Sequence, residues 1–329
     1  GSASEKAYPG GDKQSQNVKS SRGQYKDLQF RHKLPGRDQF NSQKQGPGSS
    51  HNYIFDSIKK VELNRNDIVF SEKGKSGNNL LGSGAFSQVF KGTYQGSEVA
   101  VKRIQVPLQT RDLSYFISEI SILQELKHPN VAMLLGVCSR REKFPLIVME
   151  FVACGNLHTR LHGPGRTDLN REEFYQITQD ASAGMLYLHN HQPPVLHLDL
   201  KPTNILLGHG ARAKVADFGF TKIRFKDDVK LHHRKESPTW MAPELFTSGE
   251  ITSKADVYSF GMVLWEMLTR QHPYDNFTLF QILECVQANR RPPLPSHCPK
   301  MLIEIVQKCW HQNPAKRPGF KVSCDFLVK

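Results

Sequence analysis

The sequence predicts an α+β protein in two lobes, a small sheet-rich part followed by a larger, mainly helical part. Three observations support this. Short apolar runs separated by glycines fill the segment up to about residue 152, a pattern typical of antiparallel strands joined by tight turns. Beyond residue 170 the apolar period becomes mostly helical. The 329 residues are enough for one large domain or two modest ones with a buried core.

Composition narrows the class of protein. The longest nearly uninterrupted apolar run, 144–151, is far shorter than a membrane span, so we expect none. The six cysteines include no C-x-x-C pair, and the first four residues lack a signal-peptide core. These features predict a reducing, cytoplasmic location. The formal net charge of +13 permits anionic partners such as nucleotides, nucleic acid or acidic surfaces.

Residues 1–50 are predicted to form a flexible basic tail. They hold nine Lys or Arg against four acids, and only nine of the fifty are hydrophobic. Such a segment buries too little apolar surface to offset the entropy of ordering. Its scattered aromatic residues match no nucleic-acid module, so we expect no specific nucleic-acid partner. Residues 51–77 are interpreted as a lead-in to the folded domain.

The folded part is expected to begin with strands and to continue with helices. Strands are expected at 80–81, 89–90, 99–104, 131–137 and 146–151. Apolar spacing predicts a helix between the third and fourth of them, with these residues on one face: Phe116, Ile120, Leu123 and Leu126. A later amphipathic helix presents Phe174, Ile177, Ala181, Met185 and Leu188. Segment 257–268 is apolar nearly all round, as a buried helix should be, and Ser253 with Asp256 is compatible with a capping box at its start.

A glycine-bearing motif, Leu81-Gly82-Ser83-Gly84, stands at the first expected turn. Glycines allow a backbone to approach a phosphate closely, because a Cβ would block the approach. A strand follows the motif, whereas a Rossmann fingerprint requires a helix there. By itself the motif is explained equally well by an ordinary β-turn.

Lys102 ends the apolar strand at 99–101. A lysine in that position is costly unless it has an anionic partner. Glu119 on the following helix or a bound polyphosphate is a possible partner. The alternative is a solvated lysine at a strand end, with Glu119 as an exposed helical acid.

The decisive motifs lie further along the chain. Asp199 and Asn204 fit the spacing D-x-x-x-x-N, and Asp217 opens a D-F-G sequence. An A-P-E segment ends at Glu244, and a late Arg-Pro pair includes Arg317. In these motifs, over about 78–326, the chain resembles a eukaryotic protein kinase of the tyrosine-kinase-like group, which includes the Raf and mixed-lineage kinases. The resemblance implies a bilobal kinase fold with the N-lobe and hinge over 78–152 and the C-lobe over 153–329.

The resemblance also implies how the residues would bind Mg²⁺ and ATP. The glycine-rich loop would cover the phosphates, and Lys102, oriented by Glu119, would hold two of them. Asp217 and Asn204 would be the Mg²⁺ ligands. The adenine is expected to contact the apolar side chains of Val89, Ala100 and Leu206, the gatekeeping Met149, and the backbone of Glu150 and Val152.

For catalysis, the resemblance implies that Asp199 orients the hydroxyl of a protein substrate and that Lys201 neutralises the transferred phosphoryl group. Lys201, two residues after Asp199, is typical of serine/threonine kinases. Protein substrates with serine or threonine acceptors are therefore expected, together with unidentified upstream regulators. Glu244 is expected to pair with Arg317.

Two departures from the family pattern bear on activity. Leu198 replaces the arginine that would bind an activation-loop phosphate, and Ser87 replaces the third glycine of the loop. These departures motivate an alternative reading as a weakly active pseudokinase scaffold. Retention of the complete catalytic set favours an active enzyme: Lys102, Glu119, Asp199, Asn204 and Asp217. We expect activity without loop phosphorylation, and inhibition by modification of Ser237.

Overall fold

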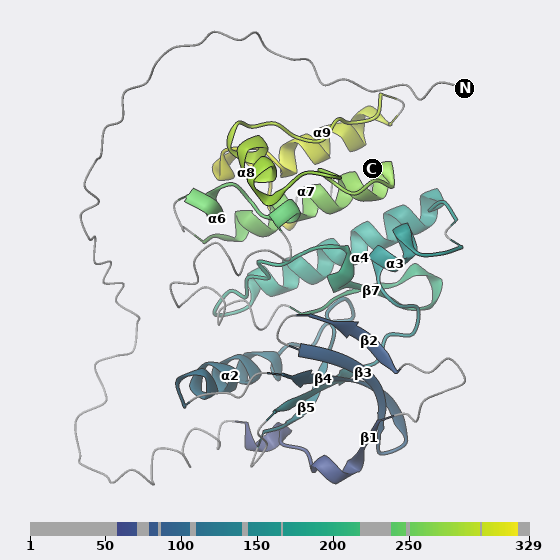
Figure 1. The fold of residues 1–329 in the computed structure, drawn as a ribbon, viewed down its shortest axis with the longest axis vertical. Helices are drawn as coiled ribbons and strands as arrows, with labels where there is room; N and C mark the ends of the chain where they lie inside the picture. The colour runs from purple at the N-terminus through teal and green to yellow at the C-terminus, as the bar shows by residue number, and fades with distance from the viewer. Residues whose placement is uncertain are drawn as a thin grey trace, which may run out of the picture. The chain divides into compact units, whose positions relative to one another are not determined.

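A computed structural model describes residues 58–70, 79–84, 87–105, 110–139, 144–165, 167–217, 238–247, 251–296 and 298–321. The predicted tail at 1–50 and Ser237 lie outside these residues. Within them, a sheet with one helix precedes a set of helices, which confirms the predicted α+β architecture. Figure 1 shows helix α4 (Arg171–Asn190) running between the sheet and the helices α7 (Ser253–Thr269) and α9 (Lys300–Cys309).

The N-lobe is built on one antiparallel sheet with the strand order β1-β3-β4-β6-β5 and with β2 paired to β3. Its strands are β1 (Ile68–Phe70), β2 (Leu80–Ser83), β3 (Ser87–Tyr94), β4 (Ser97–Ile104), β5 (Leu134–Cys138) and β6 (Leu146–Glu150). Gln95 and Gly96 join β3 to β4 in a two-residue turn, with φ values of 50° and 81°. Positive φ at both positions suits the right-handed twist of the hairpin.

The sheet begins earlier in the chain than residue 78. Strand β1 lies inside the segment interpreted as a lead-in, and it pairs with the end of β3 from Ile68 to Phe70. Two short 3-10 helices precede it, η2 (Lys59–Val61) and η3 (Arg65–Asp67). Ile58 is fully buried in the core. The described end of the lead-in is therefore part of the N-lobe.

The two faces of the sheet have different roles. Val99, Val101 and Val148 point to one face, where they form a small apolar cluster with Ile68 and Leu146. The alternation of a strand places the intervening residues of β4, Ala100 and Lys102, on the opposite face. This second face is the one that carries the predicted nucleotide contacts.

The strand predicted at 131–137 is shorter than expected, because β5 starts only at Leu134. Val131 forms an isolated parallel bridge with Val215 of the C-lobe. Next to it, the N–H of Ala132 donates to the carbonyl of Val215 at 2.8 Å, and the N–H of Val215 donates to Asn130 at 2.9 Å. The backbone before β5 thus connects the two lobes.

Helix α2 (Thr110–Leu123) accompanies the sheet, and its buried residues include Phe116, Ile120 and Leu123 of the predicted apolar face. The C-lobe contains α3 (Leu157–His162), α4 (Arg171–Asn190), α6 (Glu244–Thr247), α7 (Ser253–Thr269), α8 (Leu279–Gln287) and α9 (Lys300–Cys309). A small hairpin of β7 (Ile205–Leu207) and β8 (Ala213–Val215) interrupts the helices. The short 3-10 helices of this lobe are η4 (Pro202–Asn204), η5 (His209–Ala211), η7 (Pro238–Trp240) and η8 (Pro314–Lys316).

Helix α7 is the centre of the C-lobe, since every residue from 255 to 267 is buried. This burial confirms the helix predicted from its apolar composition. Gly261 allows α9 to approach closely, because a Cβ at this position would lie 2.8 Å from the Cβ of Cys309. Among the described residues, no helix has both the length and the apolar composition needed to cross a membrane.

Candidate active site

The loop that carries Asp199 is attached to the buried helix α7 through Asp256. The Asp256 side chain is fully buried. It accepts hydrogen bonds from the backbone N–H groups of His197 at 2.9 Å and Leu198 at 2.7 Å, and from the His189 ring at 2.8 Å. The capping box suggested for Asp256 and Ser253 is therefore wrong. Thr252 is the N-cap, and its hydroxyl accepts from the N–H of Lys254.

The attachment fixes an unusual backbone conformation. Leu198 has a φ of 60°, in the left-handed region that costs a non-glycine residue roughly 1–2 kcal/mol. The bond to Asp256 holds its N–H in that conformation. The Leu198 side chain is 7% exposed and belongs to the apolar core. Leu198, which replaces the expected arginine, thus packs into the apolar core.

His197 joins the catalytic loop to the segment before Asp217. It is fully buried, and burial lowers its pKa. Its Nδ1 accepts from the N–H of Asp199 at 3.2 Å, and its Nε2 donates to the carbonyl of Ala216 at 3.1 Å. A neutral ring with the proton on Nε2 satisfies both bonds. The His197 ring therefore holds the backbone of Asp199 next to the residue that precedes Asp217.

Asp199, Lys201 and Asn204 form one polar cluster. The Nζ of Lys201 lies 3.0 Å from Oδ2 of Asp199. The amide nitrogen of Asn204 donates to the backbone carbonyl of Asp199 at 2.8 Å and to its Oδ2 at 3.3 Å. These bonds fix the orientation of the Asn204 amide and direct its oxygen away from Asp199. The structure thus brings together three of the predicted site residues.

Lys102 of β4 and Asp217 form an ion pair across the two lobes. The lysine side chain is 11% exposed, whereas the aspartate is 42% exposed. The buried partner of Lys102 proposed from the sequence, Glu119, lies on α2 with 5% exposure. Its role in orienting Lys102 stays a prediction. The alternative reading of Glu119 as an exposed helical acid is wrong.

The described part of the glycine-rich loop is open to its surroundings. A Cβ on Gly82 would meet nothing within 4 Å, so the packing of the chain does not require glycine there. The N–H of Gly84 donates to the carbonyl of Ser87 at 2.9 Å. Leu81 is 45% exposed, and Ser83 is exposed too. An exposed apolar side chain beside accessible backbone suits contact with a bound molecule.

The strand register aligns three of the residues predicted to surround adenine. Val89 lies opposite Lys102, and Ala100 lies opposite Met149. Residues that oppose each other across a pair share a face, so these side chains lie on the Lys102 face of the sheet. Leu206, half-buried in β7, belongs to the C-lobe and bridges to Asn156.

The backbone N–H and the carboxylate of Glu150 both form hydrogen bonds within the chain. Its backbone N–H donates to the carbonyl of Met133 at 3.0 Å. Its carboxylate accepts from the N–H of Met133 at 2.8 Å and from Nζ of Lys214 at 2.9 Å. A backbone contact from Glu150 to adenine would therefore use the carbonyl oxygen. Val152, two residues on, is half-buried.

Glu244 and Arg317 form a two-armed ion pair. The guanidinium nitrogens of Arg317 lie 2.6 and 2.8 Å from the two oxygens of Glu244. The Arg317 side chain is fully buried, and it also donates to the carbonyl of Lys254 at 2.9 Å. The pair anchors α6 to the end of the described chain. Glu244 is therefore no ordinary surface charge.

The side-chain oxygen atoms of Asn204 and Asp217 suit a magnesium ion. Asn204 and Asp217 offer hard oxygen ligands, which Mg²⁺ prefers. The hydrogen bonds of the Asn204 amide nitrogen leave its oxygen as the group that would face a cation. Sequence reasoning named Asp256 only as a cap and missed that it holds the loop before Asp199, for which the signal was a carboxylate at the start of an otherwise apolar helix.

A sheet lobe that carries Lys102 is joined to a helical lobe that carries Asp199, Asn204 and Asp217, and this arrangement defines a protein kinase domain. The family model for protein tyrosine and serine/threonine kinases matches residues 76–327. The chain belongs to this family.

Several curated relatives are protein kinases by name. The dual specificity protein kinase shkA of Dictyostelium discoideum is 37% identical over 248 residues, which covers 74% of this chain and 46% of the relative. The serine/threonine-protein kinase CTR1 of Arabidopsis thaliana is 33% identical, covering 75% of this chain and 30% of the relative. The serine/threonine/tyrosine-protein kinase HT1 of Arabidopsis thaliana is 36% identical, covering 76% and 65%. The chain thus spans at most about two thirds of these proteins.

Proposed function

We propose that this chain is an active protein kinase that transfers the γ-phosphoryl group of Mg-ATP to serine or threonine hydroxyls of protein substrates. The observation that carries the proposal is the ion pair between Lys102 and Asp217 together with the cluster of Asp199, Lys201 and Asn204. The two groups are connected by the backbone, because the N–H of Ala216 donates to the carbonyl of Asn204 at 2.9 Å. Phosphoryl transfer depends on positioning and on neutralising charge more than on covalent chemistry. These side chains supply both kinds of group in one place.

Each residue then has a task that its surroundings support. Asp199 accepts a hydrogen bond from the substrate hydroxyl and orients its oxygen toward the phosphorus. Lys201, 3.0 Å from that carboxylate, balances the charge of the transferred group. Lys102 holds the phosphates, and Asn204 with Asp217 would hold Mg²⁺. When bound, the magnesium ion neutralises charge on the phosphate oxygens.

The adenine would lie between the lobes. Leu81, Val89 and Ala100 would cover it from the sheet, and Leu206 would support it from the C-lobe. The exposure of Leu81 and the shared face of Val89 and Ala100 support this placement. Met149, opposite Ala100 in the sheet, would limit access behind the base.

The choice of acceptor is the finer part of the proposal. Lys201 and the serine/threonine name of CTR1 support serine and threonine acceptors, and the resemblance places the chain in the tyrosine-kinase-like group. The names of shkA and HT1 include dual specificity and tyrosine. A serine or threonine hydroxyl lies close to the substrate backbone, whereas a tyrosine phenol lies several bonds further out. We further propose a cytoplasmic location and regulation by upstream proteins.

The test is incubation of the purified chain with labelled ATP, Mg²⁺ and a generic protein substrate, followed by phosphoamino-acid analysis. We expect phosphoserine and phosphothreonine. Products dominated by phosphotyrosine would overturn the acceptor assignment. Label no higher than that of an Asp199→Asn control would overturn the catalytic proposal and support a scaffold.

A further inference from the structure

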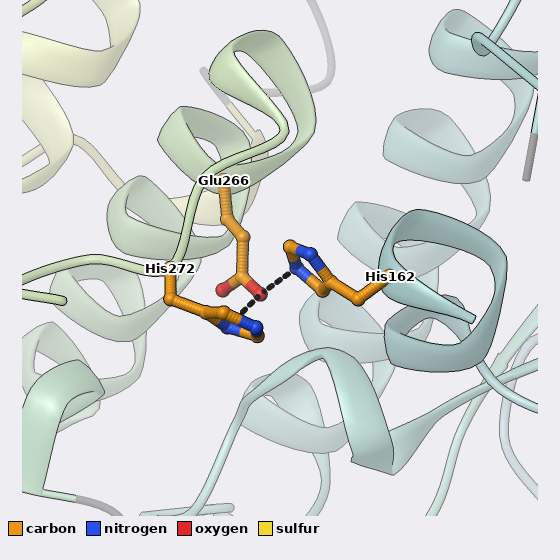
Figure 2. Close-up of side chains that lie close together, drawn as sticks. All are labelled: His162, Glu266 and His272. Atoms are coloured by element: carbon orange, nitrogen blue, oxygen red, sulfur yellow. Dashed lines mark hydrogen bonds and ion pairs between the residues drawn. The ribbon is translucent and has the colours of Figure 1, made fainter. Parts of the chain in front are cut away.

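A second cluster of polar side chains lies in the C-lobe and includes none of the residues assigned to ATP and magnesium. His162 ends α3, Glu266 lies in α7, and His272 follows α7 (Figure 2). The Nε2 of His162 lies 2.8 Å from Oε1 of Glu266, and Nδ1 of His272 lies 3.9 Å from the same oxygen. Two imidazole nitrogens thus lie close to one carboxylate oxygen.

The carboxylate at the centre of this cluster is buried. The Glu266 side chain has no exposed surface, and that of His162 is 7% exposed. The other carboxylate oxygen accepts a hydrogen bond from Nε1 of Trp240 at 3.0 Å. This bond leaves Oε1 as the oxygen that faces the two rings. A buried carboxylate is costly unless it has a positive or hydrogen-bonding partner.

It is unfavourable for the rings of His162 and His272 both to be protonated, so they do not easily provide two positive partners for the Glu266 carboxylate. The rings of His162 and His272 are stacked, with their centroids 3.9 Å apart. Two protonated rings at this distance would repel each other. His158 adds a third imidazole at the edge of the cluster, with its ring 5.1 Å from that of His162 and 5.6 Å from that of His272. A single cation bound by all the central groups would satisfy the carboxylate and both rings together.

We propose that His162, Glu266 and His272 form a zinc site. Two imidazole nitrogens and one carboxylate oxygen match the ligand types of zinc, whereas magnesium and calcium prefer oxygen ligands alone. The three ligand atoms lie within 4.8 Å of one another. Tetrahedral zinc with bonds of about 2.0–2.2 Å places its ligand atoms about 3.3 Å apart. Because the two rings are now stacked, one of them must turn away from the other to reach that geometry, and His272, with 46% exposure, has room to turn.

The site would join three segments of the C-lobe. Zinc would link the end of α3 to α7 and to the loop that carries His272. Trp240, which donates to Oε2 of Glu266, would hold the carboxylate in orientation for the metal. Because Trp240 ends η7, shortly before the A-P-E segment, the metal would also stabilise the position of that segment.

The experiment titrates Zn²⁺ alone into the chelator-treated full chain, in buffer with millimolar Mg²⁺ to occupy oxygen-rich sites. The wild type should bind a zinc equivalent that raises the midpoint of thermal unfolding. His272→Ala should weaken that binding at least about tenfold and remove the rise. The same titration with Co²⁺ should give the visible absorption of a four-coordinate ion in the wild type alone.

His311→Ala is the matched control, since His311 is a half-buried C-lobe histidine outside the cluster, with its ring bonded to the backbone of Asn313. It should bind zinc as the wild type does. A His162→Gln variant should show the same loss as His272→Ala. The proposal is overturned if the wild type binds no zinc under these conditions, or if His272→Ala and His311→Ala bind it equally well.

Discussion

The carboxylate of Asp256 accepts a hydrogen bond from the backbone N–H of Leu198 at 2.7 Å, and both residues are buried. The two residues lie 58 positions apart in the chain. The bond holds Leu198 at a φ of 60°, directly before Asp199. The position of Asp199 therefore depends on a side chain of α7.

Asp256→Asn should destabilise the protein and slow catalysis. The asparagine amide has only one acceptor oxygen. Its NH₂ group would therefore face a donor that now bonds to the second carboxylate oxygen of Asp256. Loss of a hydrogen bond to a buried charge costs roughly 1.5–3 kcal/mol, and we expect a decrease of that size in the free energy of unfolding. Chemical denaturation and initial rates measure the two effects. Asp275→Asn, the same change at an exposed position, should leave both at the wild-type level.

Two variants, Asp199→Asn and Asp217→Asn, should separate the orientation of the substrate hydroxyl from the binding of Mg²⁺ and ATP. Asp199→Asn should lose phosphoryl transfer by about 10²-fold or more, as expected for loss of a catalytic base. Asp217→Asn should also lose most of its activity, because it removes a magnesium ligand. Asp199→Asn should bind ATP normally, because its proposed contact is with the substrate hydroxyl. Asp217→Asn should weaken Mg²⁺-dependent ATP binding, since it removes a ligand and the partner of Lys102.

Calorimetric ATP titrations with and without Mg²⁺, together with single-turnover rates, check this separation. Asp168→Asn is the control, because that side chain is fully exposed. Near wild-type turnover in either active-site variant contradicts the role given to that aspartate.

His197 should lower the free energy of unfolding as the pH drops below about 6.5, whereas Glu266, whose pKa burial raises to about 8, opposes that trend. Burial lowers the pKa of His197 from its ordinary value of 6.5. The unfolded chain therefore takes up a proton that the folded ring resists. The contribution is fully present above pH 6.5 and is lost below it, by up to about 1.4 kcal/mol per pH unit for one proton.

Urea unfolding of the wild type and of His197→Gln between pH 8 and 5.5 tests this dependence. The variant should lose less free energy of unfolding over the range, whatever its stability at pH 8. Burial also lowers the pKa values of His128 and His158, so some slope should remain. Equal slopes in the two proteins would show that His197 does not contribute.

Activity should not depend on a phosphate in the activation segment. Leu198 is apolar and buried, so it offers no charge-assisted bond to such a phosphate. Phosphatase-treated and autophosphorylated enzyme should have similar initial rates, with loop occupancy measured by mass spectrometry. Ser237→Glu should reduce the rate, because the family resemblance implies that this serine precedes the acceptor site, where added negative charge would repel Asp199 and obstruct the substrate.

Leu198→Arg should introduce a dependence on loop phosphorylation, whereas Leu198→Met, which keeps the apolar packing, should not. Thermal unfolding of both variants shows whether the larger charged side chain is tolerated. A many-fold loss of wild-type activity on dephosphorylation, restored by loop phosphorylation, would mean that another cation performs the task of the missing arginine.

Much of the fold could be predicted from the sequence, because the spacing of apolar residues along a segment indicates which side of the helix or strand is buried. The apolar face of α2 and the nearly uniform apolarity of 257–268 each indicated a helix that the structure contains. The contact between Asp199 and Asn204 could be predicted too, since the two residues are only five positions apart in one motif.

Only the tertiary structure decided which distant groups meet. Val131 continues an apolar run in the sequence, yet its bridge is with Val215, because the backbone of the C-lobe offers it partners. Asp256 looked like a local cap, but its carboxylate is buried and must be satisfied by the donors packed around it. Glu266 and His162 lie 104 positions apart, and no local pattern relates them. Periodicity determines which groups are buried, whereas the packing of separate segments determines which donor each buried acceptor finds.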